Sequence, residues 1–189
     1  MLTALPGLDP HSDTPVEVLH VVLLGFVKYF WRDLVQSELI TRLNSLDVAG
    51  LGVPPLTGVT LVNYAGSLTG RDFRVIAQVA PHVIQDLVPA VVYDAWVALS
   101  TLVPLIWQPV IANLSQHLVT LEKEIHNFLI RTARWSTAWF NKAKFHVILH
   151  LPDHVRCFGP AILFATEVMC RLWLGLKPLA LARPDLALA

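Results

Sequence analysis

The sequence contains few cysteines, and this shortage narrows the class of protein. Only two are present among 189 residues, Cys157 and Cys170. They are too few for a disulfide framework or for a zinc site built from cysteines, and free thiols suit a reducing compartment. Residues 1–10 contain no basic residue and so do not resemble a secretory signal. We therefore expect an intracellular protein.

Charge is also scarce. Charged residues make up 15% of the chain and hydrophobic residues 54%, and the 14 basic residues equal the 14 acidic ones. A chain without net charge has no overall attraction to nucleic acid, so any such binding must come from a local patch. The apolar composition predicts that much apolar surface meets a partner, or that a piece of the native protein is missing.

Two common signatures of enzyme chemistry are absent. The sequence has no G-x-S-x-G nucleophile elbow. Gly50 and Gly52 are followed by Pro54-Pro55 rather than by a helix start, unlike a phosphate-binding glycine loop. We therefore expect no small-molecule substrate and no cofactor in this chain.

A long stretch without charge, Ala95–Leu121, has to be weighed as a membrane span. It is interrupted by Pro104 and Pro109, and its cleanest apolar part, Ala95–Trp107, is shorter than the roughly 20 residues that a spanning helix needs. We expect a buried helix here. A membrane-associated helical protein is the weaker alternative.

The spacing of apolar residues predicts a helix near the beginning of the chain. Thr14-Pro15-Val16-Glu17 has the form of a capping box, with Thr14 as the N-cap and Glu17 three residues later. A second helical stretch reaches about Leu46. The apolar stripe of the first helix comprises Leu19, Leu23, Phe26, Val27 and Phe30.

Loops and helices are predicted to alternate after that point. Ala49–Gly58 is a Gly/Pro loop, and Val59–Leu68 is either a short strand or a loop. A helix starts again at Arg71, one or two helices fill Ala90–Trp107, and a last apolar helix covers Ala161–Leu174.

The clearest periodic signal lies between Ile111 and Phe128. Apolar residues alternate spacings of three and four there, as in the seam of a packed helix. This seam predicts a hairpin or bundle contact, and self-association or a partner helix is a further possibility. The fold class expected is mainly α, an irregular multi-helix bundle with a single helical domain over residues 1–174 and a poorly ordered tail over 175–189.

Three histidines, His146, His150 and His154, follow one another at intervals of four. Two histidines at i and i+4 on one helical face are a known way to hold a metal ion. Pro152 interrupts the turn between the last two, so all three are not expected to align. The alternative, which we favour, is that these rings pack against an apolar helix and hydrogen-bond to the backbone.

The segment Arg131–Arg156 is basic and rich in aromatic residues. Its basic side chains could contact phosphates while its aromatic ones stack on bases. The alternative, which we favour because the chain is neutral, is a solvated basic face with its aromatic residues in the core. The basic residues are Arg131, Arg134, Lys142, Lys144 and Arg156.

Several short segments, in their order and spacing, resemble a region of the transposases of the CACTA (En/Spm) group and their fungal relatives. The similarity covers about residues 5–167. The segments are Leu5–His11, Thr14–His20, Leu24-Gly25, Lys28-Tyr29, Gly70–Phe73, Trp139–Lys142, Lys144–His146, Leu149–His154, Phe158–Pro160 and Ala165–Glu167.

The resemblance implies an RNase H-like catalytic core in which three acids hold two Mg²⁺ ions for phosphodiester strand transfer. The family's second acid and its following histidine would correspond to Glu17 and His20, and its last acid would fall near Glu167. Most of the chain would then be the family's helical insertion. The family acts on DNA in the nucleus.

Three departures from the family predict that the chain is not a working enzyme by itself. The first acid would precede Met1, Glu17 stands where the family usually has Asp, and the continuation after Glu167 is replaced by Val168–Arg171 and a Leu/Ala tail. Glu17 and Glu167 would then have structural roles. A fragment of a transposon-derived protein is our main hypothesis, and a non-enzymatic helical interaction module is the alternative.

Overall fold

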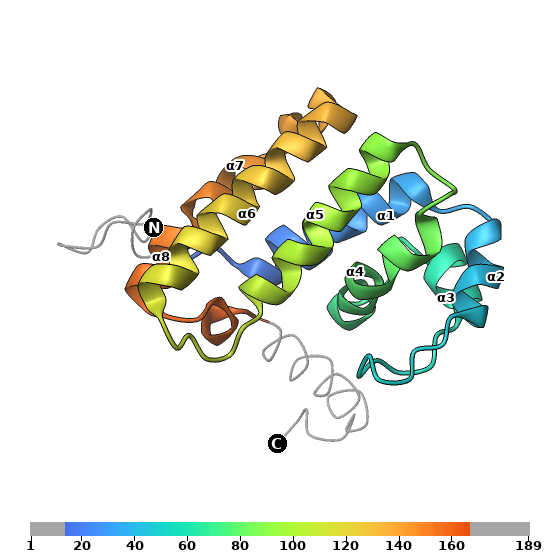
Figure 1. Ribbon diagram of the computed structural model, residues 1–189, viewed down its shortest axis with the longest axis horizontal. Helices are drawn as coiled ribbons and strands as arrows, with labels where there is room; N and C mark the ends of the chain where they lie inside the picture. The colour runs from blue at the N-terminus through green and yellow to red at the C-terminus, as the bar shows by residue number, and fades with distance from the viewer. Residues whose placement is uncertain (1–13, 167–189) are drawn as a thin grey trace, which may run out of the picture.

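The computed structural model describes residues 14–166, and the regular structure in this range is helical throughout (Figure 1). This confirms the prediction of a mainly α protein. Glu167 and the predicted tail over 175–189 lie outside the range. In chain order the elements are the π-helix η1 (Leu19–Val27), α1 (Lys28–Leu34), α2 (Glu38–Ser45), α3 (Gly58–Asn63), α4 (Gly70–Ile84), α5 (Ala90–Ile106), α6 (Leu114–Trp135), the 3₁₀ helix η2 (Thr137–Asn141), α7 (Lys144–Val147), the 3₁₀ helix η3 (Ile148–His150), α8 (Leu151–Phe158) and the 3₁₀ helix η4 (Ala161–Phe164).

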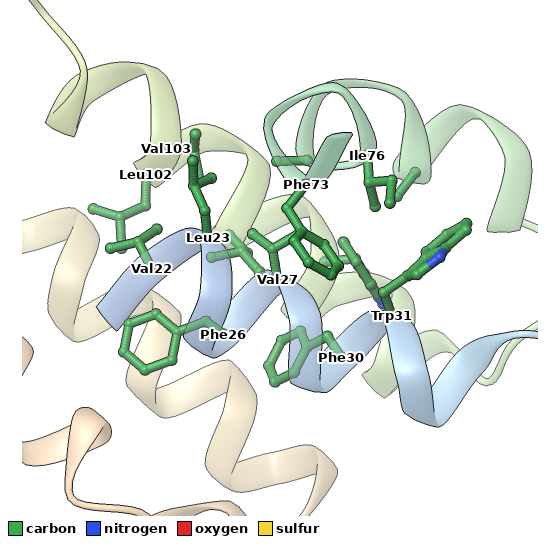
Figure 2. Close-up of a cluster of buried hydrophobic side chains, with 14 of the residues drawn as sticks. Val22, Leu23, Phe26, Val27, Phe30, Trp31, Phe73, Ile76, Leu102 and Val103 are labelled. Carbon is green, nitrogen blue, oxygen red and sulfur yellow. The ribbon is translucent and has the colours of Figure 1, made fainter. Parts of the chain in front are cut away.

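The centre of the molecule is the continuous helix formed by η1 and α1. The predicted apolar stripe on this helix is buried, and so are Val21, Val22 and Trp31 outside it. In Figure 2, some side chains of this helix are directed toward α4 and α5, whereas Phe26 and Phe30 are directed toward the opposite side. A helix that is apolar on most of its circumference belongs in the interior, which explains why the other helices surround it.

The central helix differs from the prediction in its backbone. Residues Leu19–Val27 form a π-helix, in which the backbone N–H of Lys28 reaches back to the carbonyl of Leu23 as well as to that of Gly25. π-turns are rare and lie frequently at functional sites. Apolar spacing alone did not separate this helix type from an α-helix.

The helices α5 and α6 form an antiparallel hairpin and lie side by side (Figure 1). Four residues of the predicted seam, Leu118, Leu121, Ile125 and Phe128, are buried in the chain's own core. Leu114, at the open end of the seam, is 41% exposed. The hairpin contact that the spacing predicted is therefore present. The four buried seam residues are not accessible to a partner helix, whereas Leu114 is.

The prediction for Val59–Leu68 is wrong, because this segment begins with the helix α3. Gly58 lies against α2: a Cβ atom there would be 2.4 Å from the carbonyl oxygen of Ile40. The side chain of Asn44 accepts the Gly58 N–H at 2.8 Å, and the Trp31 indole donates to the Leu61 carbonyl at 2.8 Å. These contacts come from other helices and outweigh the local preference of a Val- and Thr-containing segment.

Two other segments refine the predicted elements. A single helix, α5, fills Ala90–Ile106, because Pro104 falls in its last turn and interrupts little of the hydrogen-bond ladder. The predicted helix over Ala161–Leu174 begins as the short η4, after which Ala165 is extended with ψ 132°. Within residues 14–166, no helix has both the length and the apolar character needed to cross a membrane.

Phe128 is expected to be essential for stability, because its ring closes the aromatic part of the core. Its ring centroid lies 5.0 Å from that of Phe26 and 6.1 Å from that of Phe145. We expect Phe128→Ala to lower the free energy of unfolding by about 3–5 kcal/mol in urea titrations. Val119→Ala, on the exposed face of the same helix, is the control and should change it by less than about 0.5 kcal/mol. Equal losses in the two variants would contradict this packing.

Candidate functional site

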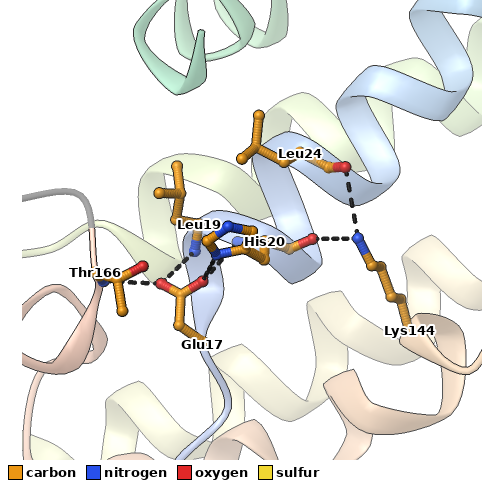
Figure 3. Close-up of polar contacts among 6 residues, drawn as sticks. All are labelled: Glu17, Leu19, His20, Leu24, Lys144 and Thr166. Carbon is orange, nitrogen blue, oxygen red and sulfur yellow. Dashed lines mark hydrogen bonds and ion pairs between the residues drawn. The ribbon is translucent and has the colours of Figure 1, made fainter. Parts of the chain in front are cut away.

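The carboxylate of Glu17 is the centre of a polar cluster at the start of the central helix (Figure 3). Oε1 accepts the backbone N–H of Leu19 at 3.1 Å and that of Thr166 at 2.9 Å. Oε2 accepts the backbone N–H of His20 at 2.8 Å and also contacts Nδ1 of the His20 ring. Both oxygens are therefore engaged, by donors from the two ends of the described chain.

Glu17 acts as an N-cap and not as the last member of a capping box, which corrects the prediction. Residues 14–17 are not helical, and the helix starts only after them. The carbonyl of Glu17 accepts the Val21 N–H at 3.1 Å, while its side chain accepts N–H groups two and three residues ahead. This is the bonding pattern of an N-cap residue. The carboxylate also lies at the positive end of the helix dipole.

Lys144 joins the cluster from the far side of the helix. Its Nζ donates to the carbonyl oxygen of His20 at 2.6 Å and to that of Leu24 at 3.5 Å, across more than a hundred residues of sequence. Gly25 leaves space for this approach: a Cβ atom there would be 2.9 Å from the His20 oxygen and 2.9 Å from Cδ of Lys144. Gly25 and Lys144, far apart in the sequence, therefore pack against each other.

The environment shifts the pKa of Glu17 downward. Partial burial of the carboxylate by itself would raise the pKa, but the hydrogen bonds from Thr166, His20 and Leu19 together outweigh it. Glu17 is therefore ionised at neutral pH. A metal ion at this carboxylate would have to compete with the backbone N–H groups that already bind it.

The histidines separate into a pair and a single residue. Nδ1 of His154 accepts the backbone N–H of Val16 at 2.8 Å, which is the structural role that we favoured for these rings. His146 and His150 face each other instead, with their Nε2 atoms 3.4 Å apart. This pair lines a cleft of about 440 Å³ together with Val147 and residues 14–17.

A complete metal centre is not assembled in the part of the chain that the structure describes. Between residues 14 and 166, no three side chains of His, Cys, Asp or Glu come together in an arrangement that could hold a metal ion. Glu17 and His20 are brought together, whereas Glu167 lies just beyond the last described residue.

The predicted basic patch is dispersed. Arg131 pairs with Asp94 at 2.9 Å, and Arg156 pairs with Asp153 and, at 4.0 Å, with Glu122. The aromatic partners Trp135 and Trp139 pack on the buried ring of Phe30, with centroid distances of 4.7 Å and 5.3 Å.

The remaining basic residues have separate environments. Lys142 lies over the rings of Tyr29 and Trp139, and Lys144 belongs to the Glu17 cluster. Arg134 is exposed in the last turn of α6, where a positive charge suits the helix dipole. Most of these side chains therefore have intramolecular contacts of their own.

Sequence reasoning did not identify Gly25 and Thr166 as members of the cluster. A single glycine inside an otherwise apolar helical segment was the available signal for Gly25, since such a residue usually has a packing reason. The role of Thr166 had no signal, because only its backbone N–H takes part.

We expect Gly25→Ala to destabilise the protein by about 1–3 kcal/mol, since the added methyl group would come too close to both the His20 carbonyl and the Lys144 side chain. Gly66→Ala is the matched control, because a Cβ atom there meets nothing within 4 Å. In a Lys144→Ala background, the cost of Gly25→Ala should fall, as measured by a double-mutant cycle. Equal costs for the two glycine substitutions would contradict the close approach of Lys144.

Glu17→Gln should remove a pH-dependent part of the stability. Because folding lowers the pKa of Glu17 from its ordinary value of 4.5, its contribution is complete above that pH and is lost as the pH falls through the folded-state pKa. At neutral pH we expect a loss of about 1–2 kcal/mol on substitution.

The measurement is the free energy of unfolding of both proteins from pH 7 to pH 3, and the difference between them should shrink toward the acidic end. Glu38→Gln, at an exposed position in the first turn of α2, should show a much smaller difference. A difference that does not depend on pH would argue against the capping role of the ionised carboxylate.

No family model, curated protein or solved structure matches this chain. What the Glu17 cluster does has to be inferred from its own contacts and from the resemblance of the segments that form it.

Proposed function

We propose that this chain derives from a CACTA-like DNA transposase and that, by itself, it does not cut DNA. The observation that carries the proposal is the meeting of separate resembling segments at one place. Lys144 reaches the carbonyl of His20, Thr166 donates to Glu17, and His154 accepts from Val16. These contacts span 124, 149 and 138 residues of sequence.

The convergence supports a common origin of the segments in one functional region. Unrelated similarities scattered along a chain would not be expected to gather around the start of a single helix. The segments Thr14–His20, Leu24-Gly25, Lys144–His146 and Leu149–His154 and the residues Ala165-Thr166 all contribute to or adjoin the cluster. In the family that they resemble, the corresponding region contributes an acid to metal-dependent strand transfer.

The state of Glu17 supports loss of cleavage activity. Cutting by two metal ions requires several carboxylates with oxygen atoms open to the ions. Here each oxygen of Glu17 already accepts backbone N–H groups, and a glutamate replaces the shorter aspartate usual in the family. In this proposal the former catalytic acid now caps the central helix. If any activity remains, Mg²⁺ would be the cofactor.

DNA contact belongs to the same proposal but would be weak. Arg131 and Arg156 are ion-paired within the chain, so fewer positive charges are available to bind phosphates than the sequence alone predicted. Arg134 and Lys142 are the remaining candidates. Action on DNA would place the protein in the nucleus.

A plasmid-nicking assay tests the proposal. Purified protein and Glu17→Gln are incubated with supercoiled DNA and Mg²⁺, and the melting temperature of each protein is measured alongside. We expect no nicking above the buffer control in either sample and a lower melting temperature for Glu17→Gln, since the substitution removes a cap. Nicking by the unmodified protein that disappears in Glu17→Gln would show that Glu17 is a working catalytic acid and would overturn the proposal.

A further inference from the structure

The face of α7 and η3 that is turned away from the core presents two imidazoles in a fixed arrangement. Phe145, Ile148 and Leu151 are buried and anchor this segment against the rest of the protein. His146 and His150, on the other side, are exposed. The ring planes are inclined at 82° and the ring centroids are 5.1 Å apart.

The separation of the two ring nitrogens suits a shared metal ion better than a direct hydrogen bond. The Nε2 atoms are 3.4 Å apart, beyond the usual range of about 2.7–3.2 Å for hydrogen bonds donated by N–H groups. A tetrahedral ion with metal–nitrogen distances of about 2.0–2.1 Å places its nitrogen ligands roughly 3.3–3.4 Å apart. Both histidines could therefore bind one such ion without moving their Nε2 atoms.

The surroundings of the pair favour a cation. The pair lines the cleft of about 440 Å³, and Glu17, which lines the same cleft, is ionised at neutral pH. The nearest lysine in the sequence, Lys144, directs its ammonium group to the His20 carbonyl on the central helix. His154 is not a member of the pair, because its Nδ1 accepts the Val16 N–H.

We propose that His146 and His150 form an open site for a divalent transition-metal ion of the Zn²⁺, Ni²⁺ or Cu²⁺ class. Imidazole nitrogen is a good ligand for these ions, whereas Mg²⁺ prefers oxygen. Two protein ligands leave the other coordination positions to water or to an external donor that enters the cleft. Binding should lie in the micromolar range. This site is independent of the transposase proposal, which concerns oxygen ligands and Mg²⁺.

Calorimetric titration of the untagged full chain with Zn²⁺ tests the site, with His146→Ala, His150→Ala and the control His82→Ala, an exposed histidine on α4. We expect each substitution in the pair to weaken Zn²⁺ binding by about tenfold or more, and His82→Ala to leave it unchanged. Millimolar Mg²⁺ should not compete. The affinity should fall as the solution is made more acidic, because protons compete with the metal ion for the imidazole nitrogens.

The change in melting temperature on adding Zn²⁺ is a second measure of binding, and it can be read even for variants whose own stability is altered. Saturating Zn²⁺ should raise the melting temperature of the unmodified protein and of His82→Ala but not that of His146→Ala or His150→Ala. The proposal is overturned if the unmodified protein fails to bind Zn²⁺, or if His146→Ala binds it as tightly as the unmodified protein does. Neither result would bear on the nicking assay, so the two proposals can fail separately.

Discussion

A helix that is buried along most of its length must find hydrogen-bond partners for the backbone groups at its ends. The N–H groups at its start have no partners within the helix, and water reaches them poorly when other helices surround it. The central helix of this protein faces that constraint because its circumference is apolar. Glu17 meets it by accepting the N–H groups of Leu19 and His20.

The same carboxylate also connects the two ends of the described chain. Oε1 accepts the Thr166 N–H, which becomes available because Ala165 is extended and ends the short helix before it. Lys144 adds a third connection by donating to carbonyl groups of the helix at the position that Gly25 leaves open. Segments that the chain separates widely are therefore held around the start of one helix. Removing the negative charge at Glu17 would weaken the contacts that its carboxylate makes with Thr166, Leu19 and His20.

This use of Glu17 bears directly on the proposed origin of the protein. A carboxylate that caps a helix through both of its oxygens has less capacity to bind a metal ion, so a structural role and a catalytic role compete for the same atoms. The histidine pair, by contrast, has exposed nitrogen atoms and no competing backbone donor on its Nε2 atoms in the described structure.

The sequence by itself determined the helical class and much of the core. Apolar spacing identified the buried stripe of the first helix and the seam of α6, because a periodicity of about 3.6 residues is a local property of the chain. The same local signals misplaced the helix start at Thr14 and missed α3, whose contacts with α2 outweigh the preference of its own residues. They favoured the structural interpretation of the histidines and of the basic segment, but they could not identify the contacts that these side chains make.

Only the tertiary structure decided those points. The path of the chain pairs Arg131 with Asp94 and places Lys144 on the His20 carbonyl. It also separates His154 from the His146–His150 pair. Each of these contacts except the histidine pair joins residues far apart in the sequence, and no local pattern encodes the partner. Spacing shows which face a side chain occupies, but the atom that it meets depends on how the helices pack.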